Sequence, residues 1–101
     1  MKALLATLVT LSAFSAHALE SHYGKLSQRG HVYTCTLTNK TNNTLDMKYV
    51  EFSFLRIGGH GDHEFTVRNR IDERVRTGEK ISNSVSQSFV QTAYGCKYIA
   101  R

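Results

Sequence analysis

The stretch His31–Asn39, with the sequence HVYTCTLTN, decides how this chain folds. Its residues alternate: Tyr33, Cys35 and Leu37 share one parity, and threonines occupy the other. A period of two in aromatic and β-branched residues is typical of a half-buried β-strand. The only other cysteine, Cys96, lies in a similar alternating run near the end of the chain. We therefore expect two strands that direct their sulfur atoms into one interior.

The first eighteen residues predict a cleaved signal peptide rather than a part of the fold. Lys2 gives a basic start, residues 3–14 are apolar, and Ala16-His17-Ala18 fits the small-x-small cleavage rule. The apolar run is short for a membrane anchor, although an uncleaved anchor helix is the alternative. We expect export to the periplasm or the outside of the cell, and a mature chain, residues 19–101, that has no membrane span and forms a single domain.

Export also decides how the cysteines and the charge are interpreted. In an oxidising compartment, two cysteines on two strands predict a disulfide rather than a metal pair or a catalytic thiol. The chain is basic, with a formal net charge of +5, and only Lys2 of its cations lies in the predicted signal peptide. A basic domain favours an acidic protein or an anionic envelope polymer as its partner. We expect no specific nucleic-acid partner.

The alternation along the mature chain predicts an all-β domain, in the form of a small two-sheet sandwich. In the segment from Glu64 to Arg76, Asn69 and Glu73 interrupt the apolar parity, so one strand is expected to end near Arg70. A short helical turn remains an alternative for residues 71–76. The expected strands are His31–Asn39, Thr44–Arg56, Glu64–Arg70, Lys80–Val90 and Tyr94–Ala100.

Three connecting features complete this description. The polar segment Leu19–Gly30 is expected to be a partly ordered lead-in. Lys40–Asn43 is a run of turn formers and predicts a hairpin connection. Within Thr44–Arg56 the apolar parity switches near Tyr49-Val50, which predicts a β-bulge or a bend at that point. A central strand covered on both faces is the alternative.

The segment Tyr94-Gly95-Cys96 resembles the Tyr-x-Cys corner of immunoglobulin-like sandwiches, in which the cysteine pairs with one on an early strand. The resemblance implies an immunoglobulin- or fibronectin-III-like sandwich with a Cys35–Cys96 disulfide. The chain has no tryptophan to pack on this disulfide, and too few residues follow Cys96 to complete a final strand. Open strand edges of this kind are compatible with a homodimer formed by edge pairing or strand exchange. An architecture alone carries no function.

Arginines are concentrated on one parity of the segment from Glu64 to Arg76. If this segment is extended, their side chains leave one face at about 7 Å per two residues. Guanidinium groups suit carboxylates and phosphates, so this face is the candidate partner-binding surface; protection of an edge strand is the alternative. The candidate contact residues are Arg56, Arg68, Arg70, Arg74 and Arg76.

A second candidate site is the glycine-rich segment containing His60, Asp62 and His63. Two imidazoles with a carboxylate between them could bind zinc or copper, with His22 or His31 completing the ligand set if the fold brings them close. The spacing matches none of the rigid metal-binding signatures. This hypothesis makes the chain a metal-binding periplasmic protein.

The sequence predicts no enzymatic activity. The serines that alternate along Lys80–Val90 lack a Gly-x-Ser-x-Gly elbow and a nearby histidine base, so they predict a polar strand face. The leading hypothesis is a small exported binding or interaction protein that contacts an anionic partner through the arginine face. The alternatives are the metal-binding protein and an envelope-associated structural factor that binds anionic polymer by general charge.

Overall fold

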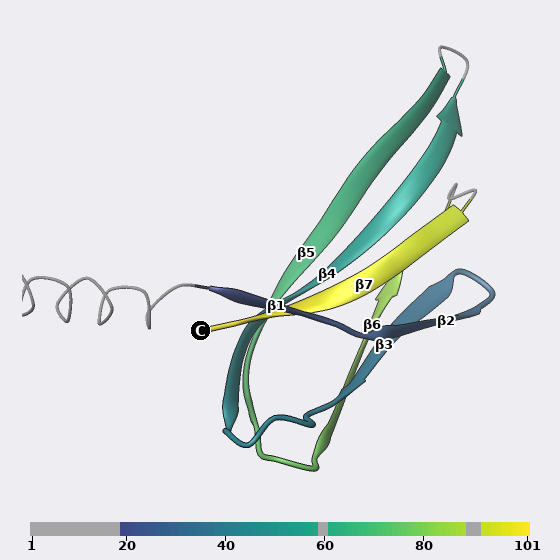
Figure 1. The fold of residues 1–101 in the computed structure, drawn as a ribbon. Helices are drawn as coiled ribbons and strands as arrows, with labels where there is room; N and C mark the ends of the chain where they lie inside the picture. The colour runs from purple at the N-terminus through teal and green to yellow at the C-terminus, as the bar shows by residue number, and fades with distance from the viewer. Residues whose placement is uncertain (1–18, 59–60, 89–91) are drawn as a thin grey trace, which may run out of the picture.

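The computed structural model describes residues 19–58, 61–88 and 92–101, which form antiparallel strands in two sheets (Figure 1). The four-stranded sheet has the order β1-β7-β4-β5, and the three-stranded sheet has the order β2-β3-β6. The expectation of an all-β fold with two sheets is confirmed. The strands are β1 (Glu20–Tyr23), β2 (Lys25–Arg29), β3 (Val32–Thr38), β4 (Leu45–Gly58), β5 (Gly61–Val75), β6 (Lys80–Ser86) and β7 (Thr92–Ala100).

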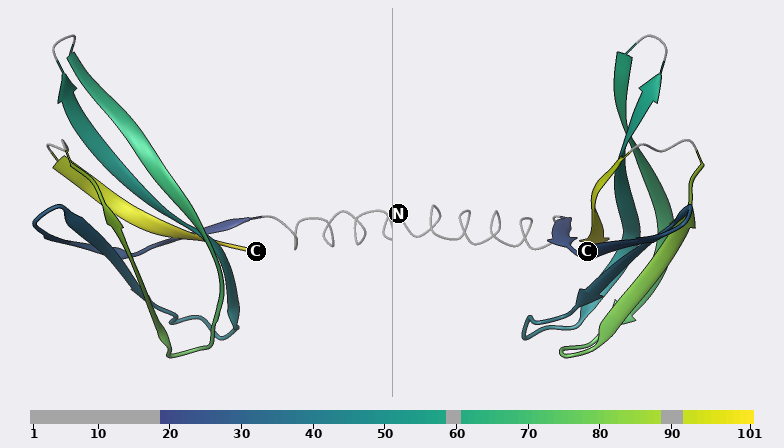
Figure 2. Two further views of the ribbon diagram at one scale, coloured as in Figure 1. Left: turned by 180° about the vertical axis from the view of Figure 1, so that it is seen from behind. Right: turned by 90° about the vertical axis from the view of Figure 1, so that its right-hand side faces the viewer.

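The segment Leu19–Gly30 is not the partly ordered lead-in that its polarity predicted. It forms β1, which pairs with β7, and β2, which pairs with β3 in the other sheet. Gly24 joins the two strands, and its backbone N–H donates to the Cys96 carbonyl oxygen at 3.1 Å. The chain therefore crosses from one sheet to the other within a single residue. Figure 2 shows the dark blue N-terminal segment passing from beside β7 into the other sheet.

The prediction of a hairpin at Lys40–Asn43 is wrong, because β3 pairs with β2 and β6 and not with β4. The segment instead carries the chain from the three-stranded sheet to the four-stranded sheet. Asn39 fixes this corner and is 1% exposed. Its side-chain N–H groups donate to the carbonyl oxygens of Asn43 (2.9 Å) and Val75 (2.8 Å), and its side-chain oxygen accepts from the Thr41 amide (2.9 Å) and hydroxyl (2.6 Å). A buried polar side chain with all its hydrogen bonds formed specifies one path for the chain.

The predicted irregularity in the longest apolar strand is confirmed. The pairing register of β4 shifts between Met47 and Tyr49, against both β5 and β7. Because of this shift, Met47 before it and Val50 after it are both buried in the same core. β4 is also a central strand of its sheet.

The prediction that a strand ends near Arg70 is wrong, and so is the alternative of a helical turn across residues 71–76. β5 continues to Val75. Asp72 adopts a positive φ of 47°, a conformation that aspartate tolerates better than most residues. The register places two residues, Ile71 and Asp72, opposite Lys48, so the strand absorbs an extra residue without ending.

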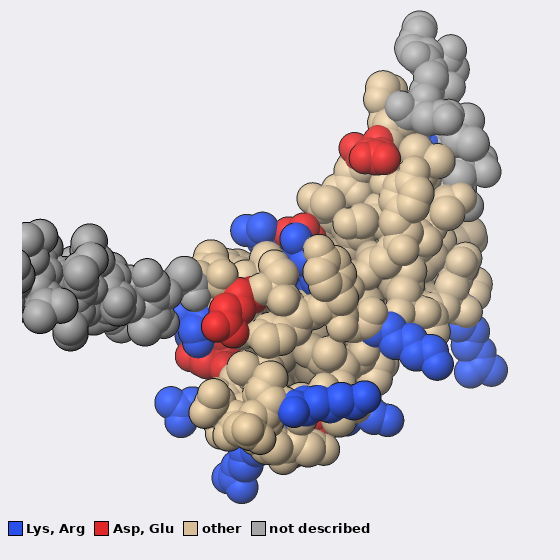
Figure 3. Space-filling model, in the orientation of Figure 1, with Lys and Arg blue, Asp and Glu red and all other residues tan. Residues whose placement is uncertain are grey.

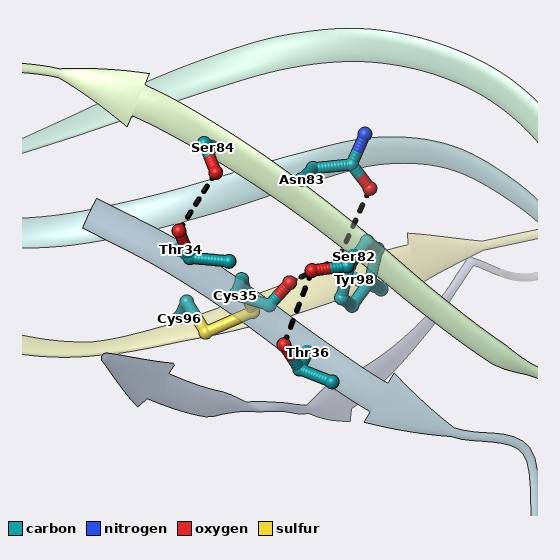
Figure 4. Close-up of a disulfide and its surroundings, with 8 residues drawn as sticks. All are labelled: Thr34, Cys35, Thr36, Ser82, Asn83, Ser84, Cys96 and Tyr98. Carbon is teal, nitrogen blue, oxygen red and sulfur yellow. Dashed lines mark hydrogen bonds between the residues drawn. A yellow bond between two sulfur atoms is a disulfide. The ribbon is translucent and has the colours of Figure 1, made fainter. Parts of the chain in front are cut away.

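The core lies between the sheets around the predicted Cys35–Cys96 disulfide, which is present with a Cα–Cα distance of 5.9 Å and joins residues 61 apart in sequence (Figure 4). Tyr98 is fully buried beside it. Its hydroxyl donates to the Cys35 carbonyl oxygen at 2.8 Å and lies 3.0 Å from the side-chain oxygen of Asn83. Burial raises the pKa of Tyr98 well above its usual value. The disulfide therefore sits in a closed, hydrogen-bonded interior.

Aromatic rings extend this core towards the β4–β5 hairpin. The ring of Phe54 meets that of Tyr33 edge-on at 5.0 Å and lies 5.3 Å from that of Phe65. Aromatic pairs at these separations contribute beyond the area that they bury. The cluster of buried residues is Tyr33, Cys35, Leu45, Met47, Val50, Phe52, Phe54, Val75, Ile81, Cys96, Tyr98 and Ala100.

The tyrosine of the Tyr-x-Cys segment does not occupy the corner position that the sequence predicted. Tyr94 is 55% exposed. The register between β4 and β7 shifts at this point, because Ser53 pairs with Gly95 whereas Phe54 pairs with Ala93. The shift turns Tyr94 out of the interior, and Tyr98 is the tyrosine that packs beside the disulfide.

Among the described residues, no helix has the length and apolar character needed to cross a membrane. The predicted signal peptide, residues 1–18, lies outside them.

Candidate functional site

The arginines of β5 lie along the outer edge of the four-stranded sheet, since β5 is its last strand. Arg68, Arg70 and Arg74 are exposed on one parity of the strand, and Arg76 is exposed just after its end. The register supports this arrangement: Arg68 faces Glu51, and Arg74 faces Asp46. We call these four residues the arginine row. Because β5 does not end at Arg70, the structure brings all four onto one continuous segment.

Arg68 is largely neutralised within the sheet. Its Nε and Nη2 atoms lie 2.9 and 2.8 Å from Oε2 of Glu51, and its guanidinium group lies over the Tyr49 ring at 5.3 Å. Glu51 is 8% exposed and is also approached by Lys97, whose Nζ lies 3.8 Å from Oε1. A nearly buried carboxylate requires such partners. Arg68 therefore has a structural role that its position in the sequence did not reveal.

Arg70 is paired with a carboxylate on its own strand. Its Nε lies 2.6 Å from Oδ2 of Asp72, and Lys48 lies 3.7 Å from the other oxygen of the same group. The hydrogen bond from Arg70 lowers the pKa of Asp72, and the same bond raises the pKa of Arg70. Both groups are exposed, so solvent screens the pair and limits its energetic value.

Arg74 and Arg76 differ from the other two members of the row. Neither side chain forms an ion pair with any residue that the structure describes. The backbone N–H of Arg76 donates to the Glu79 carboxylate at 2.8 Å, which fixes the chain while leaving the guanidinium group exposed. The two arginines that are available to a partner therefore lie at the end of β5.

Arg56 does not join the arginine row. It lies opposite His63, near the far end of the β4–β5 hairpin. Asp46, the residue opposite Arg74, is ten positions away along β4, or roughly 33 Å in an extended strand. The structure thus separates Arg56 from the other arginines with which the sequence grouped it.

The predicted metal site lies partly outside the described residues, which exclude His60. His63 is exposed near the tip of the β4–β5 hairpin, whereas His31 lies at the turn between β2 and β3 and His22 contacts Glu20 on β1. Across residues 19–58, 61–88 and 92–101, no group of three or more histidine, cysteine or acidic side chains is close enough to hold a metal ion. The structure does not bring His22 or His31 to His63.

The serines of β6 are used structurally. The hydroxyl of Ser84 lies 2.7 Å from that of Thr34, and the hydroxyl of Ser82 lies 3.2 Å from that of Thr36 (Figure 4). Hydroxyl pairs of this kind are a normal stabilising contact between neighbouring strands. The polar face predicted for this strand is therefore a ladder of hydrogen bonds with β3.

Sequence reasoning missed two hollows on either side of the Gly24 crossing. The larger, about 540 Å³, is lined at its rim by Lys25, Lys40 and Lys80. The smaller, about 270 Å³, lies between Tyr23 and Tyr94 above Gly95. No local sequence signal could identify the larger hollow, because its lysines come from three separate parts of the chain.

No protein-family model matches this chain, and neither the curated proteins nor the solved structures contain a significant match.

Proposed function

We propose that this chain is a small exported, non-enzymatic binding protein that contacts an anionic partner, either a protein or an envelope polymer, through the arginine row. The observation that carries the proposal is the pair of exposed guanidinium groups, Arg74 and Arg76, which have no ion-pair partner among the described residues. An exposed guanidinium group can form two parallel hydrogen bonds with a carboxylate or a phosphate. Arg68 and Arg70 extend the positive face along the strand.

The pairing of Arg68 and Arg70 with carboxylates supports the proposal in a second way. Arg68 is held against Glu51 and the Tyr49 ring, so a partner would meet a surface that is already ordered at this point. Ordering such side chains on binding would otherwise cost free energy. Protection of the β5 edge by charge is the competing explanation of the same residues, and it predicts no partner.

We also propose that the architecture is immunoglobulin- or fibronectin-III-like. The order β2-β3-β6 corresponds to strands A, B and E of such domains, and β7-β4-β5 corresponds to F, C and C′. The disulfide then joins strands B and F, as in antibody domains. The N-terminal strand β1 lies beside β7, where the final strand G of those domains would lie.

The proposal of export rests on the residues 1–18 pattern and on the disulfide. A disulfide that closes a long loop is expected to persist in an oxidising compartment, such as the periplasm or the outside of the cell.

The proposed function is tested by binding to immobilised poly-L-glutamate in 0.15 M salt, with the variant Arg74→Glu/Arg76→Glu. We expect its affinity to be at least tenfold weaker than that of the unmodified protein. The matched control, Arg29→Glu/Arg56→Glu, changes the net charge by the same amount at two positions away from the row. It should lose no more than about threefold, because exposed charges beyond the Debye length of about 8 Å are largely screened.

Two results would contradict the proposal. If the control loses as much affinity as the Arg74→Glu/Arg76→Glu variant, the protein binds polyanions by general charge, as an envelope-associated structural factor would. If neither variant loses affinity, the arginines protect the edge of the sheet and have no part in binding.

A further inference from the structure

The larger hollow is formed where the chain crosses between the sheets. β2 begins at Lys25, which pairs with Thr36, but β3 continues through Leu37 and Thr38. On that side, the edge of β3 at these two residues has no neighbouring strand in the described part of the chain. The result is an open hollow of about 540 Å³, which falls within the size range of small-molecule sites.

The charge around this hollow is of one sign. Lys25 comes from the start of β2, Lys40 from the segment after β3 and Lys80 from the start of β6, and all three are exposed. No acidic residue lines the hollow, and none of the three lysines forms an ion pair with a described residue. The nearest acidic residue in sequence, Glu79, accepts a hydrogen bond from the backbone of Arg76. In Figure 3, basic side chains predominate over the lower part of the face shown.

An aromatic ring completes one side of the hollow. Tyr23 lines it and is 76% exposed, the largest exposed fraction among the large hydrophobic residues of the described chain. Its backbone is constrained by pairing with Lys97 and by the next residue, Gly24, which lies against the disulfide. A Cβ atom at Gly24 would be only 2.6 Å from the Cys35 sulfur and 3.4 Å from the Cys96 sulfur. The ring of Tyr23 and the ammonium group of Lys25 are thus attached to a rigid point of the fold.

We propose that this hollow binds an anionic sugar, in which a phosphate or carboxylate group contacts the lysines and the face of the ring packs on Tyr23. Lysine ammonium groups bind such anions as point charges. The hydroxyl of Thr38 and the open backbone edge of β3 provide hydrogen-bonding groups for sugar hydroxyls. A single exposed ring suits one sugar, whereas single-stranded nucleic acid is bound by several aromatic rings on which successive bases stack.

The site is distinct from the arginine row, which lies on the edge strand of the other sheet. It is tested on the disulfide-bonded full chain by following amide chemical shifts in NMR titrations. The probes are glucose 1-phosphate, glucuronate, glucose and inorganic phosphate. We expect both anionic sugars to shift the amides of residues 23–25, 37–40 and 80, and to bind at least fivefold more tightly than either glucose or phosphate alone. The relative affinity of the two anionic sugars shows whether phosphate or carboxylate is preferred.

Variants separate the two parts of the proposal. Lys25→Gln/Lys80→Gln should weaken binding of glucose 1-phosphate at least tenfold, whereas the control Arg29→Gln/Arg56→Gln, with the same loss of charge, should stay within twofold. Tyr23→Ala should weaken the sugar phosphate at least threefold and leave inorganic phosphate unchanged. Arg74→Glu/Arg76→Glu should change the affinities for glucose 1-phosphate and inorganic phosphate by the same factor, because it alters only the charge near Lys80, so failure of the arginine proposal would be seen separately.

Three results would overturn the inference. The first is equal affinity for inorganic phosphate and glucose 1-phosphate, which would leave a simple anion site. The second is an equal loss in the control variant, which would indicate general charge. The third is that neither anionic sugar, at 20 mM, shifts the amides of the residues that line the hollow.

Discussion

The disulfide junction and the arginine row differ in whether their polar groups are buried or exposed. The junction, which consists of Gly24, Cys35, Cys96 and Tyr98, is closed, and its buried hydroxyl has hydrogen-bond partners. The row is exposed, and two of its four arginines are paired with carboxylates of the described residues. The junction is therefore where substitutions should change the free energy of unfolding. Substitutions of Arg70, Arg74 and Arg76 should change binding and little else, because exposed ion pairs contribute at most about 1 kcal/mol. Arg68 differs, because it also neutralises the nearly buried Glu51.

The largest effect is expected from removal of the disulfide. The bond closes a loop between residues 61 apart, and the chain-entropy model assigns to such a loop about 4 kcal/mol of stabilisation. The variant Cys35→Ala/Cys96→Ala should lose about this much free energy of unfolding in urea denaturation. An unchanged denaturation midpoint would contradict the central role of the junction.

Gly24 and Gly95 provide a matched pair of substitutions at the crossing. Gly24→Ala would place a methyl group against the Cys35 sulfur, whereas a Cβ atom at Gly95 meets nothing within 4 Å. Overpacking of a closed interior costs about 2 kcal/mol, so urea denaturation should show that loss for Gly24→Ala. Gly95→Ala should stay within about 0.5 kcal/mol of the unmodified protein. Equal losses for both would mean that the disulfide does not restrict residue 24.

The corner between the sheets gives a similar contrast. Asn39→Ala removes the hydrogen bonds to Asn43 and Val75, and the buried Val75 carbonyl oxygen loses this donor. The expected cost is about 2 kcal/mol, measured by thermal or urea unfolding. Asn42→Ala, at an exposed position of the same segment, should cost less than about 0.5 kcal/mol. A small effect at Asn39 would show that the corner does not depend on its side chain.

Tyr98 makes the free energy of unfolding depend on pH. Because burial raises its pKa in the folded chain, the stability that it contributes is fully present below the ordinary tyrosine pKa of 10.0 and is lost as the pH rises above that value. Between pH 10 and 11 the free energy of unfolding should fall by about 1 kcal/mol more in the unmodified protein than in Tyr98→Phe. At pH 7 the variant should lose about 1 kcal/mol with its hydrogen bond to Cys35. Parallel pH profiles of the two proteins would contradict this account.

Parity along the chain was enough to predict the strands around Cys35 and Cys96 and the irregularity near Tyr49, whereas the disulfide was predicted from the expected export and from the immunoglobulin-like resemblance. The strands and the irregularity depend on local alternation, which the sequence shows directly. The roles of Gly24 and Asn39 depend on atoms brought close by the fold: a sulfur atom in one case and the Val75 carbonyl oxygen in the other. No local pattern could reveal them.

The candidate sites also combine features that the local sequence shows with features that depend on the fold. The arginine row was visible because its members lie on one continuous segment, but the carboxylates that pair with Arg68 and Arg70 were not assigned from the sequence. The strand was also expected to end near Arg70, because the left-handed conformation of Asp72 cannot be read from alternation. The hollow between Lys25, Lys40 and Lys80 depends on contacts between distant segments, so it could be found only in the fold.

The central claim is that stability and binding depend on different residues. It is tested most directly by the dissociation constant for poly-L-glutamate. Gly24→Ala and Arg74→Glu/Arg76→Glu are compared for binding to poly-L-glutamate at 10 °C, under conditions where circular dichroism shows both to be folded. The account predicts that Gly24→Ala binds within twofold of the unmodified protein and that the arginine variant binds at least tenfold more weakly. A tenfold loss in Gly24→Ala together with unchanged binding by the arginine variant would contradict it.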